Sequence, residues 1–440
     1  MLKKYISLNF LSQVINLITS FASSILLARV LGPEGRGDYI LVLTSVGFLV
    51  QFFTFGIESS ITHFVASGKI KHSRLLFSII VYVSFLSLLL ILGTILVSYF
   101  TKRVLIPAQN VHYYVVLILL VLFTFLENVL ISLLNGVKAF RSVIVTSICF
   151  NFLIVLAALV FFIFFRGQDS LAIPLLYATV GVHFVITLAY IYSYVHSRQI
   201  ELQRTLLKKD EFRQFALYSF ISFTASVLQY LNYKMDFWVV NYYWGPANLG
   251  VYSLAASLSQ LLWIFPQSIA TIMFPMTSYF QRDQLTDITE RITRVSVFIT
   301  LIIVIPVFAL SPFFIPLLFG KAFASSVFYF QIFLFGVFPF IVMKVLGSVF
   351  AGIGKVKYNL YCTIIGFVGG AIAYLTLIPT LGLTGGVIGS IISYVLATSV
   401  GVFLYRKEFL SPIMDLLIVK RTDIRFLSAQ MKRVVSRVKG

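Results

Sequence analysis

Charged residues are scarce in this chain of 440 residues. They make up 11% of the sequence, whereas a soluble domain contains about 25%, and hydrophobic residues make up 59%. This composition excludes an ordinary soluble domain and indicates a protein that lies mostly in lipid. Acidic residues are the scarcer of the two signs, with 15 Asp and Glu against 34 Lys and Arg, so the net charge is +19.

Cysteine and the common catalytic motifs are also scarce. Cys149 and Cys362 lie in apolar runs, which excludes a disulfide framework or a cysteine metal site. The sequence contains no phosphate-cradling loop for ATP, no paired-histidine zinc motif and no serine nucleophile elbow. We therefore predict a protein that is not an enzyme and holds no metal or cofactor. Any energy that it uses would come from an ion gradient, the membrane potential or the gradient of its own cargo.

Long apolar runs fill most of the sequence instead. A transmembrane helix needs about 20 mostly apolar residues. The runs predict an all-α polytopic membrane protein with twelve transmembrane helices. The predicted spans cover residues 6–29, 39–66, 75–100, 112–134, 141–165, 171–195, 213–241, 248–278, 292–318, 325–350, 358–379 and 384–405.

Two stretches of the chain copy each other. Residues 32–41 read GPEGRGDYIL and residues 245–254 read GPANLGVYSL. The recurring residues of this motif, which we expect to act as a hinge, are Gly32, Pro33 and Gly37 in the first copy and Gly245, Pro246 and Gly250 in the second. A duplicated membrane bundle has its binding site where the repeats meet, so cargo is expected between the halves.

The copies divide the chain into two lobes of six helices each. Six is an even number, so both halves enter the membrane from the same side and the repeat is parallel. The predicted domains are an N-terminal lobe (1–196), a cytoplasmic linker (197–212), a C-terminal lobe (213–405) and a basic cytoplasmic tail (406–440).

The basic residues fix the orientation of the spans. Most of the 34 Lys and Arg fall on one side of the predicted membrane, which places both termini in the cytoplasm. The basic residues on the outer side are Arg29, Arg36, Lys102, Arg103, Arg166 and Lys321. The positive charge therefore faces anionic membrane lipids, and no nucleic-acid partner is required.

Polar stripes run along the first two helices of each lobe. Each stripe repeats at the three- or four-residue spacing of one helical face. Their amides are predicted to bind substrate in a hydrated cavity, and these are Gln13, Asn16, Gln51, Gln229 and Gln260. A plainer interpretation is that small and polar residues hold membrane helices together.

Charged residues inside predicted spans are stronger evidence of a functional role than the polar stripes, because each charge costs about 2.5–3.5 kcal/mol at mid-membrane on insertion scales. The cations Arg29, Lys234 and Lys344 are predicted to bind an anionic substrate. The acids predicted to couple an ion are Asp236, Glu58 and Glu127. The alternatives are mutual neutralisation of Lys234 and Asp236 or their snorkelling near the outer interface, and a structural pair of Glu127 with Lys344.

Several motifs resemble one family of membrane proteins. The run LARVLGPEGRGDY (27–39) resembles the polysaccharide transporter family, the Wzx-type O-antigen flippases of the multidrug/oligosaccharidyl-lipid/polysaccharide exporter (MOP) superfamily. DFWVVNYYWGPANLGVYSLA (236–255), FPMTSYF (274–280) and GLTGGVIGSIISYV (382–395) are similar to other signatures of that family. The second copy departs from the pattern, because no arginine precedes Gly245. That departure puts a symmetric two-arginine phosphate clamp in doubt.

The resemblance implies two lobes around a cleft that opens alternately to each side of a bacterial inner membrane. It implies a cargo of undecaprenyl-pyrophosphate-linked oligosaccharide for O-antigen, lipopolysaccharide or exopolysaccharide synthesis, flipped from the inner to the outer leaflet. Arg29 matches the family's arginine before LGPE, and Asp236 matches its helix 7 acid, which implies a sodium or proton site there. A complex with a polysaccharide polymerase and a chain-length regulator is a further implied partner.

Two other functions remain open from the sequence. A multidrug/cation antiporter of the same superfamily would use an acidic, aromatic cleft. The three acids in the spans allow this, whereas Arg29 and Lys344 disfavour it. A membrane glycosyltransferase is the other alternative, and the short external loops leave no room for its catalytic groups.

Overall fold

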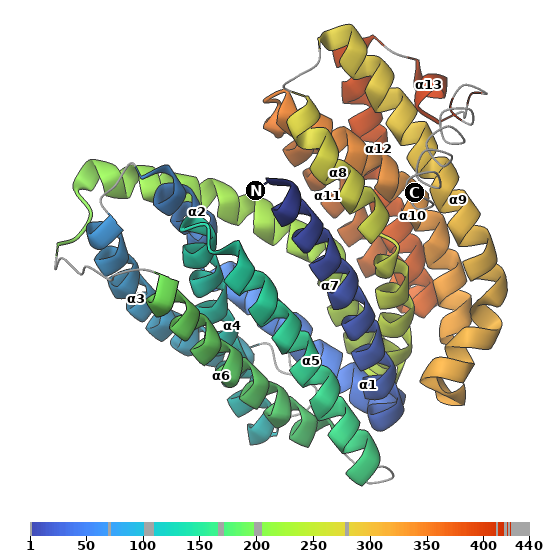
Figure 1. Cartoon of the computed structure of the whole chain (residues 1–440). Helices are drawn as coiled ribbons and strands as arrows, with labels where there is room; N and C mark the ends of the chain where they lie inside the picture. The colour runs from blue at the N-terminus through green and yellow to red at the C-terminus, as the bar shows by residue number, and fades with distance from the viewer. Residues whose placement is uncertain are drawn as a thin grey trace, which may run out of the picture. The chain divides into compact units, whose positions relative to one another are not determined.

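The computed structural model describes residues 2–68, 72–100, 110–165, 171–197, 205–277, 281–410, 412–417, 420 and 423. Within these residues every regular element is a helix (Figure 1). The helices of the first half are α1 (Leu2–Phe53), α2 (Ile57–Ser67), α3 (His72–Phe100), α4 (Val111–Gly136), α5 (Phe140–Phe164) and α6 (Ala172–Ser197). Those of the second half are α7 (Lys209–Leu261), α8 (Ile264–Met276), α9 (Arg282–Phe319), α10 (Ser326–Gly352), α11 (Val356–Leu381), α12 (Leu383–Phe409) and α13 (Ile413–Leu417), with a 3-10 turn at Lys321–Phe323.

In this described part, nine helices are long and apolar enough to cross a membrane. The all-helical, multi-pass architecture is as predicted, but the count of twelve spans is not confirmed. Two predicted spans, 6–29 and most of 39–66, fall on α1, on either side of the break in its helical backbone at Gly32. The equivalent helix α7 is not among the nine, because its stripe of polar and charged residues lowers its mean hydropathy.

The two long helices bend at the repeated motif. α1 has 52 residues and α7 has 53, and each contains one residue with a non-helical backbone, Gly32 or Gly245. Their φ angles are 62° and 77°, in the left-handed region that favours glycine. Each glycine precedes a proline, which has no N–H to donate to the turn before it. The glycine and proline therefore end one helix and begin the next, so each long element consists of two helices that meet at the motif.

A second break lies inside each predicted second span. Residues 54–56 form a turn between α1 and α2, and residues 262–263 form one between α7 and α8. Phe55 and Gly56 have φ angles of 50° and 70° at the first break. The sequence predicted continuous helices over 39–66 and 248–278, and both predictions are wrong at these turns. The apolar composition is continuous across them, so hydropathy alone gives no signal.

The chain divides into two compact units. Unit 1 comprises Met1–Ser253 and Leu318–Ala322, and unit 2 comprises Leu254–Leu317 and Phe323–Gly440. Within unit 1, α1 packs against α5, while α4 packs against α2, α3 and α6. Within unit 2, α12 packs against α10 and α11, and α8 packs against α10.

Large apolar side chains cover the outside of both units. On α3, Phe85 and Leu92 are 60% and 59% exposed, and on α9, Phe313 and Leu317 are 73% and 71% exposed. Contiguous apolar exposure on this scale is unfavourable in water. It is the surface expected of helices that face lipid.

Candidate functional site

The two copies of the glycine-proline motif meet inside unit 1. A Cβ atom added to Gly37 would lie 1.8 Å from the carbonyl oxygen of Pro246, and one added to Gly250 would lie 1.8 Å from that of Pro33. Gly37 and Gly250 are equivalent residues of the two copies, and so are Pro33 and Pro246. The contact is therefore reciprocal, as a pseudo-twofold relation between the copies requires. Backbone meets backbone here, which only glycine permits.

Asp236 lies on α7, just before the second motif. It is 4% exposed, and its Oδ2 accepts a hydrogen bond from Tyr252 at 2.6 Å. Its Oδ1 has no hydrogen-bond partner within the described residues. A buried carboxylate oxygen without a donor is costly, and a bound cation or proton would satisfy it.

Lys234 lies two residues before Asp236 and does not form a salt bridge with it in the described part of the chain. Its Nζ lies 4.4 Å from the ring centroid of Phe237 instead. Mutual neutralisation through a direct ion pair is therefore not what the structure shows. A lysine over an aromatic ring keeps its charge available to an anion.

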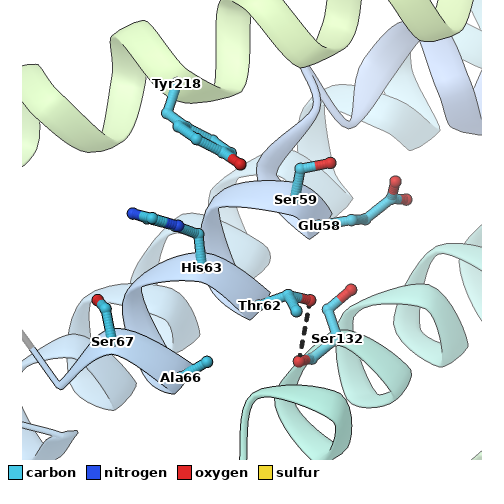
Figure 2. Close-up of a pocket in the computed structure, with 8 residues that line it drawn as sticks. All are labelled: Glu58, Ser59, Thr62, His63, Ala66, Ser67, Ser132 and Tyr218. Carbon is cyan, nitrogen blue, oxygen red and sulfur yellow. Dashed lines mark hydrogen bonds between the residues drawn. The ribbon is translucent and has the colours of Figure 1, made fainter. Parts of the chain in front are cut away.

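Glu58 lines a cavity of about 700 Å³ in unit 1 (Figure 2). The other lining residues are Ser59, Thr62, His63, Ala66, Ser67, Ser132 and Tyr218. They come from α2, α4 and α7. Glu58 lies in the first turn of α2, and its Oε1 accepts a hydrogen bond from Asn128 at 3.1 Å. The turn at residues 54–56, which the sequence did not predict, places the carboxylate at this helix start.

Glu127 is paired inside unit 1. The Nδ1 atom of His183 lies 3.0 Å from its Oε2, and the hydroxyl of Thr187 donates to its Oε1 at 3.4 Å. His183 and Thr187 are one turn apart on α6, facing α4. The sequence analysis proposed Lys344 as a partner for Glu127 and did not identify this pair. The spacing of His183 and Thr187 shows that they share one helical face, but it does not identify Glu127 as their partner.

The stripe on α1 has a matching stripe on α5. The side chain of Asn151 donates to Oδ1 of Asn16 at 3.1 Å, and Asn16 donates to the hydroxyl of Ser147 at 3.4 Å. Ser20 also donates to Asn151 at 3.4 Å. These bonds favour the plainer interpretation for part of the stripe, since here polar groups do hold two helices together.

The remaining predicted amides are at least partly accessible. Gln13 and Gln229 are exposed, while Gln51 and Gln260 are half-buried. Nε2 of Gln229 donates to the hydroxyl of Tyr233 at 3.5 Å. Gln260 belongs to unit 2 and the other three belong to unit 1.

The other two predicted cations have different surroundings. Arg29 is exposed, and its Nε donates to the carbonyl of Leu318 at 2.6 Å, within unit 1. Lys344 belongs to unit 2 and is half-buried, with its Nζ 5.2 Å from the ring centroid of Phe340. That ring stacks on Trp263 at 4.0 Å. Within the part described, Lys344 makes no salt bridge.

Arg36 differs most from the sequence prediction. It was assigned to an external loop, but it lies in α1 with 3% of its surface exposed. Its Nη1 and Nη2 donate to the carbonyl and hydroxyl of Ser24, at 3.2 and 3.3 Å. The guanidinium thereby bridges the bend at Gly32. No composition signal separates this arginine from one in a loop.

The described residues contain no group of three or more His, Cys, Asp or Glu that could hold a metal ion. The side chains that the structure does bring together offer binding chemistry. They are cations beside aromatic rings, buried carboxylates, and amides and hydroxyls that can form hydrogen bonds.

Comparison with protein families gives two matches. The model of the family described as "Polysaccharide biosynthesis protein" matches residues 2–281. The MatE model matches residues 222–375. No curated protein sequence matches the chain.

Several solved structures share the fold. An inward-facing multidrug resistance MATE family transporter of the MOP superfamily has a TM-score of 0.71 at 16% identity, covering 90% of this chain and 94% of that one. The lipid II flippase MurJ in an inward closed conformation has a TM-score of 0.73 at 16% identity, covering 93% and 88%. A MOP superfamily transporter from Pyrococcus furiosus has a TM-score of 0.61 at 17% identity, covering 91% and 93%. At such identities the likeness shows the fold alone.

Proposed function

Because the chain belongs to the polysaccharide biosynthesis protein family and is a MOP-superfamily transporter, not an enzyme, we propose that it is a flippase for lipid-linked oligosaccharide. Its cargo would be an undecaprenyl-pyrophosphate-linked O-antigen or exopolysaccharide repeat unit, moved from the inner to the outer leaflet of a bacterial plasma membrane. Both termini would lie in the cytoplasm, with the basic tail (406–440) and linker (197–212) on anionic lipids. A polysaccharide polymerase and a chain-length regulator would be its partners.

The physical problem is to carry a sugar headgroup and two phosphates across about 30 Å of hydrocarbon. The proposal depends mainly on the surroundings of the ammonium groups of Lys234 and Lys344. Lys234 on α7 and Lys344 on the apolar helix α10 each lie beside an aromatic ring, and neither forms a salt bridge within the described residues. A cation without a direct salt bridge suits an anionic cargo, because its charge is not fully compensated, although Asp236 attracts Lys234 electrostatically.

The mechanism assigns each predicted group a role. Arg29, Lys234 and Lys344 would neutralise the pyrophosphate between two lobes that open alternately to each side. The sugar hydroxyls would bond to the amides of Gln13, Asn16, Gln51, Gln229 and Gln260. The polyprenyl tail would stay in lipid throughout.

Removal of either span lysine tests the proposal. We expect Lys234→Gln and Lys344→Gln to slow flipping of a lipid-linked oligosaccharide in vesicles at least tenfold, because a hydrogen bond to a charged group contributes about 1.5–3 kcal/mol. Lys321→Gln, at an exposed lysine after α9, is the matched control and should stay within twofold. Unchanged flipping in both span variants would contradict the proposal.

Ion coupling is assigned to Asp236, with Glu58 and Glu127 as further candidates. Sodium or a proton at the unpartnered Oδ1 of Asp236 would bias the inward and outward states by its different affinity for them. We expect Asp236→Asn to abolish the dependence of flipping on an imposed ion gradient. Asp210→Asn, at an exposed acid in the first turn of α7, should keep that dependence. An ion response that survives Asp236→Asn would remove this residue from the role.

A multidrug/cation antiporter is the second candidate function. The MatE match over residues 222–375 and the buried Asp236 favour it. Efflux of a cationic dye, run beside the flipping assay, separates the two. Dye transport without flipping would support the antiporter.

A further inference from the structure

The cavity at Glu58 forms a site of its own within unit 1. Its volume of about 700 Å³ falls within the range of about 300–1,000 Å³ that is typical of small-molecule sites. α2, α4 and α7 supply its walls, and Figure 2 shows their side chains turned toward one another. Neither the pyrophosphate contacts nor the ion site proposed above uses these walls as a set.

Close contacts hold the walls in place. A Cβ atom added to Gly56 would lie 2.3 Å from the carbonyl oxygen of Ser219, so α2 begins directly against the backbone of α7. The hydroxyl of Ser60 lies 2.7 Å from that of Ser219 and donates to the carbonyl of Phe215 at 3.0 Å. The hydroxyl of Ser222 donates to that of Ser59 at 2.6 Å. These bonds fix the cavity before any ligand enters.

The cavity surface presents hydrogen-bond acceptors. Thr62, Ser67 and Ser132 donate their hydroxyl protons to backbone carbonyls, so their oxygens face outward as acceptors. Oε2 of Glu58 accepts no hydrogen bond from the described part of the chain. The hydroxyl of Ser59, which accepts from Ser222 and keeps its own proton, and the ring N–H of His63 add donors to the same wall. The complementary ligand is one whose hydroxyl groups both donate and accept.

An aromatic platform lies beside these acceptors. The ring of His63 stacks on that of Tyr218, with centroids 4.8 Å apart and planes 16° apart. Tyr218 is 42% exposed, so its ring remains accessible to a ligand. A pyranose ring has an apolar C–H face and a rim of hydroxyl donors. It therefore fits a flat aromatic surface next to a carboxylate and hydroxyl oxygens.

The cavity lies at the loading end of the path in the proposed orientation. It extends along α2, near the end of α4 and the beginning of α7, which is the side of the basic residues Lys138, Lys208 and Lys209. An ion pair of 3.2 Å between Arg74 and Glu211 joins the starts of α3 and α7 at the same end.

We propose that this cavity binds a sugar residue of the cargo in the cytoplasmic leaflet, with Glu58 accepting from its hydroxyls and Tyr218 stacking on its ring. The inference rests on the proposed flippase function and adds a subsite that recognises the sugar, separate from the cations that bind the pyrophosphate. Cargo without a sugar would then bind through the cations alone.

The test compares two lipids on the full-length protein in nanodiscs. One is undecaprenyl pyrophosphate bearing a single N-acetylglucosamine, and the other is undecaprenyl pyrophosphate alone. We expect the wild type to bind the sugar-bearing lipid at least tenfold more tightly. Glu58→Gln and Tyr218→Ala should reduce that preference to less than threefold, and Tyr218→Ala should leave the affinity for the sugar-free lipid within twofold. Tyr218→Phe should keep the preference, since it keeps the ring.

A matched control is available on α6. Tyr192 is exposed and stacks on His196 with centroids 5.1 Å apart, outside the cavity. Tyr192→Ala should leave the sugar preference unchanged, and so separate a role in the cavity from a general effect of removing a stacked tyrosine.

Each of the remaining outcomes would contradict either the sugar subsite or the flippase function. A wild type without sugar preference, or cavity variants that retain it, would overturn the sugar subsite. Binding of tetraphenylphosphonium that Glu58→Gln abolishes, in place of a sugar preference, would make the cavity a cation site. Flipping is measured in parallel. A cavity-dependent sugar preference without flipping would contradict the flippase function and leave the subsite standing, whereas flipping without that preference would contradict the subsite alone.

Discussion

Gly37→Ala and Gly250→Ala should each destabilise the protein by about 3 kcal/mol or more, the upper end of the range for overpacked sites. The added methyl group would lie 1.8 Å from a proline carbonyl oxygen of the other motif copy, and a backbone atom cannot turn aside as a flexible side chain can. For a chain of this size the cost should lower the apparent Tm by about 3 °C or more. Thermal unfolding of the purified protein, followed by tryptophan fluorescence, measures this change.

The control has the opposite expected sign. Gly181 lies in α6, and a Cβ atom added there would meet nothing within 4 Å. Gly181→Ala should therefore be neutral or raise the Tm slightly, because alanine is the better helix former by about 1 kcal/mol. Equal Tm values for all three variants would show that the two motifs are not in backbone contact.

His183→Leu should destabilise the protein by about 1–3 kcal/mol, because it leaves the carboxyl group of Glu127 buried without its closest partner. Glu127→Leu should cost a similar amount. The double variant should cost less than the sum by about 0.6–1.7 kcal/mol, as double-mutant cycles give for polar pairs between membrane helices. Unfolding of the single and double variants provides the double-mutant cycle.

His112→Leu is the matched control for this pair. His112 also lies 3.0 Å from a side-chain oxygen, that of Tyr177, but the pair is exposed. Its loss should change stability by no more than about 0.5 kcal/mol. Strictly additive effects at Glu127 and His183 would contradict the pair. Loss of ion-dependent flipping in Glu127→Gln, with stability unchanged, would favour the coupling role for Glu127 over the structural one.

The sequence predicted much of the fold because membrane helices follow from composition. Eight predicted spans correspond closely to α3–α6 and α9–α12. The repeat was visible because glycine and proline mark special backbone geometry, and Gly32 and Gly245 do adopt left-handed φ angles. These signals are local, so a single chain is enough to read them.

The predictions that failed depend on tertiary contacts. The turn at residues 54–56 leaves hydropathy unchanged and exists because Gly56 fits against the backbone of α7. Arg36 has the composition signal of a loop residue, yet it donates to Ser24 across a bend. The partners of Glu127 are on α6, which is distant in sequence. No spacing rule within one helix identifies a contact between two.

For the site residues too, local features were predictable from the sequence and tertiary contacts were not. Charges in apolar runs could be identified from the sequence, and Asp236 and Glu127 are indeed buried. What each charge meets could not be identified. Lys234 meets the ring of Phe237 and not the nearby carboxylate, and Asn16 meets Asn151 on α5.

Because the contact between the two motifs is reciprocal, it constrains the evolution of both halves of the gene. A bulkier residue at Gly37 needs a displaced Pro246, and one at Gly250 needs a displaced Pro33. Neither copy can therefore change at these positions independently of the other, although much of the surrounding sequence has diverged beyond easy alignment. In a set of related sequences, these four positions should vary as a linked quartet, and chimeras that exchange only one copy between distant relatives should assemble poorly.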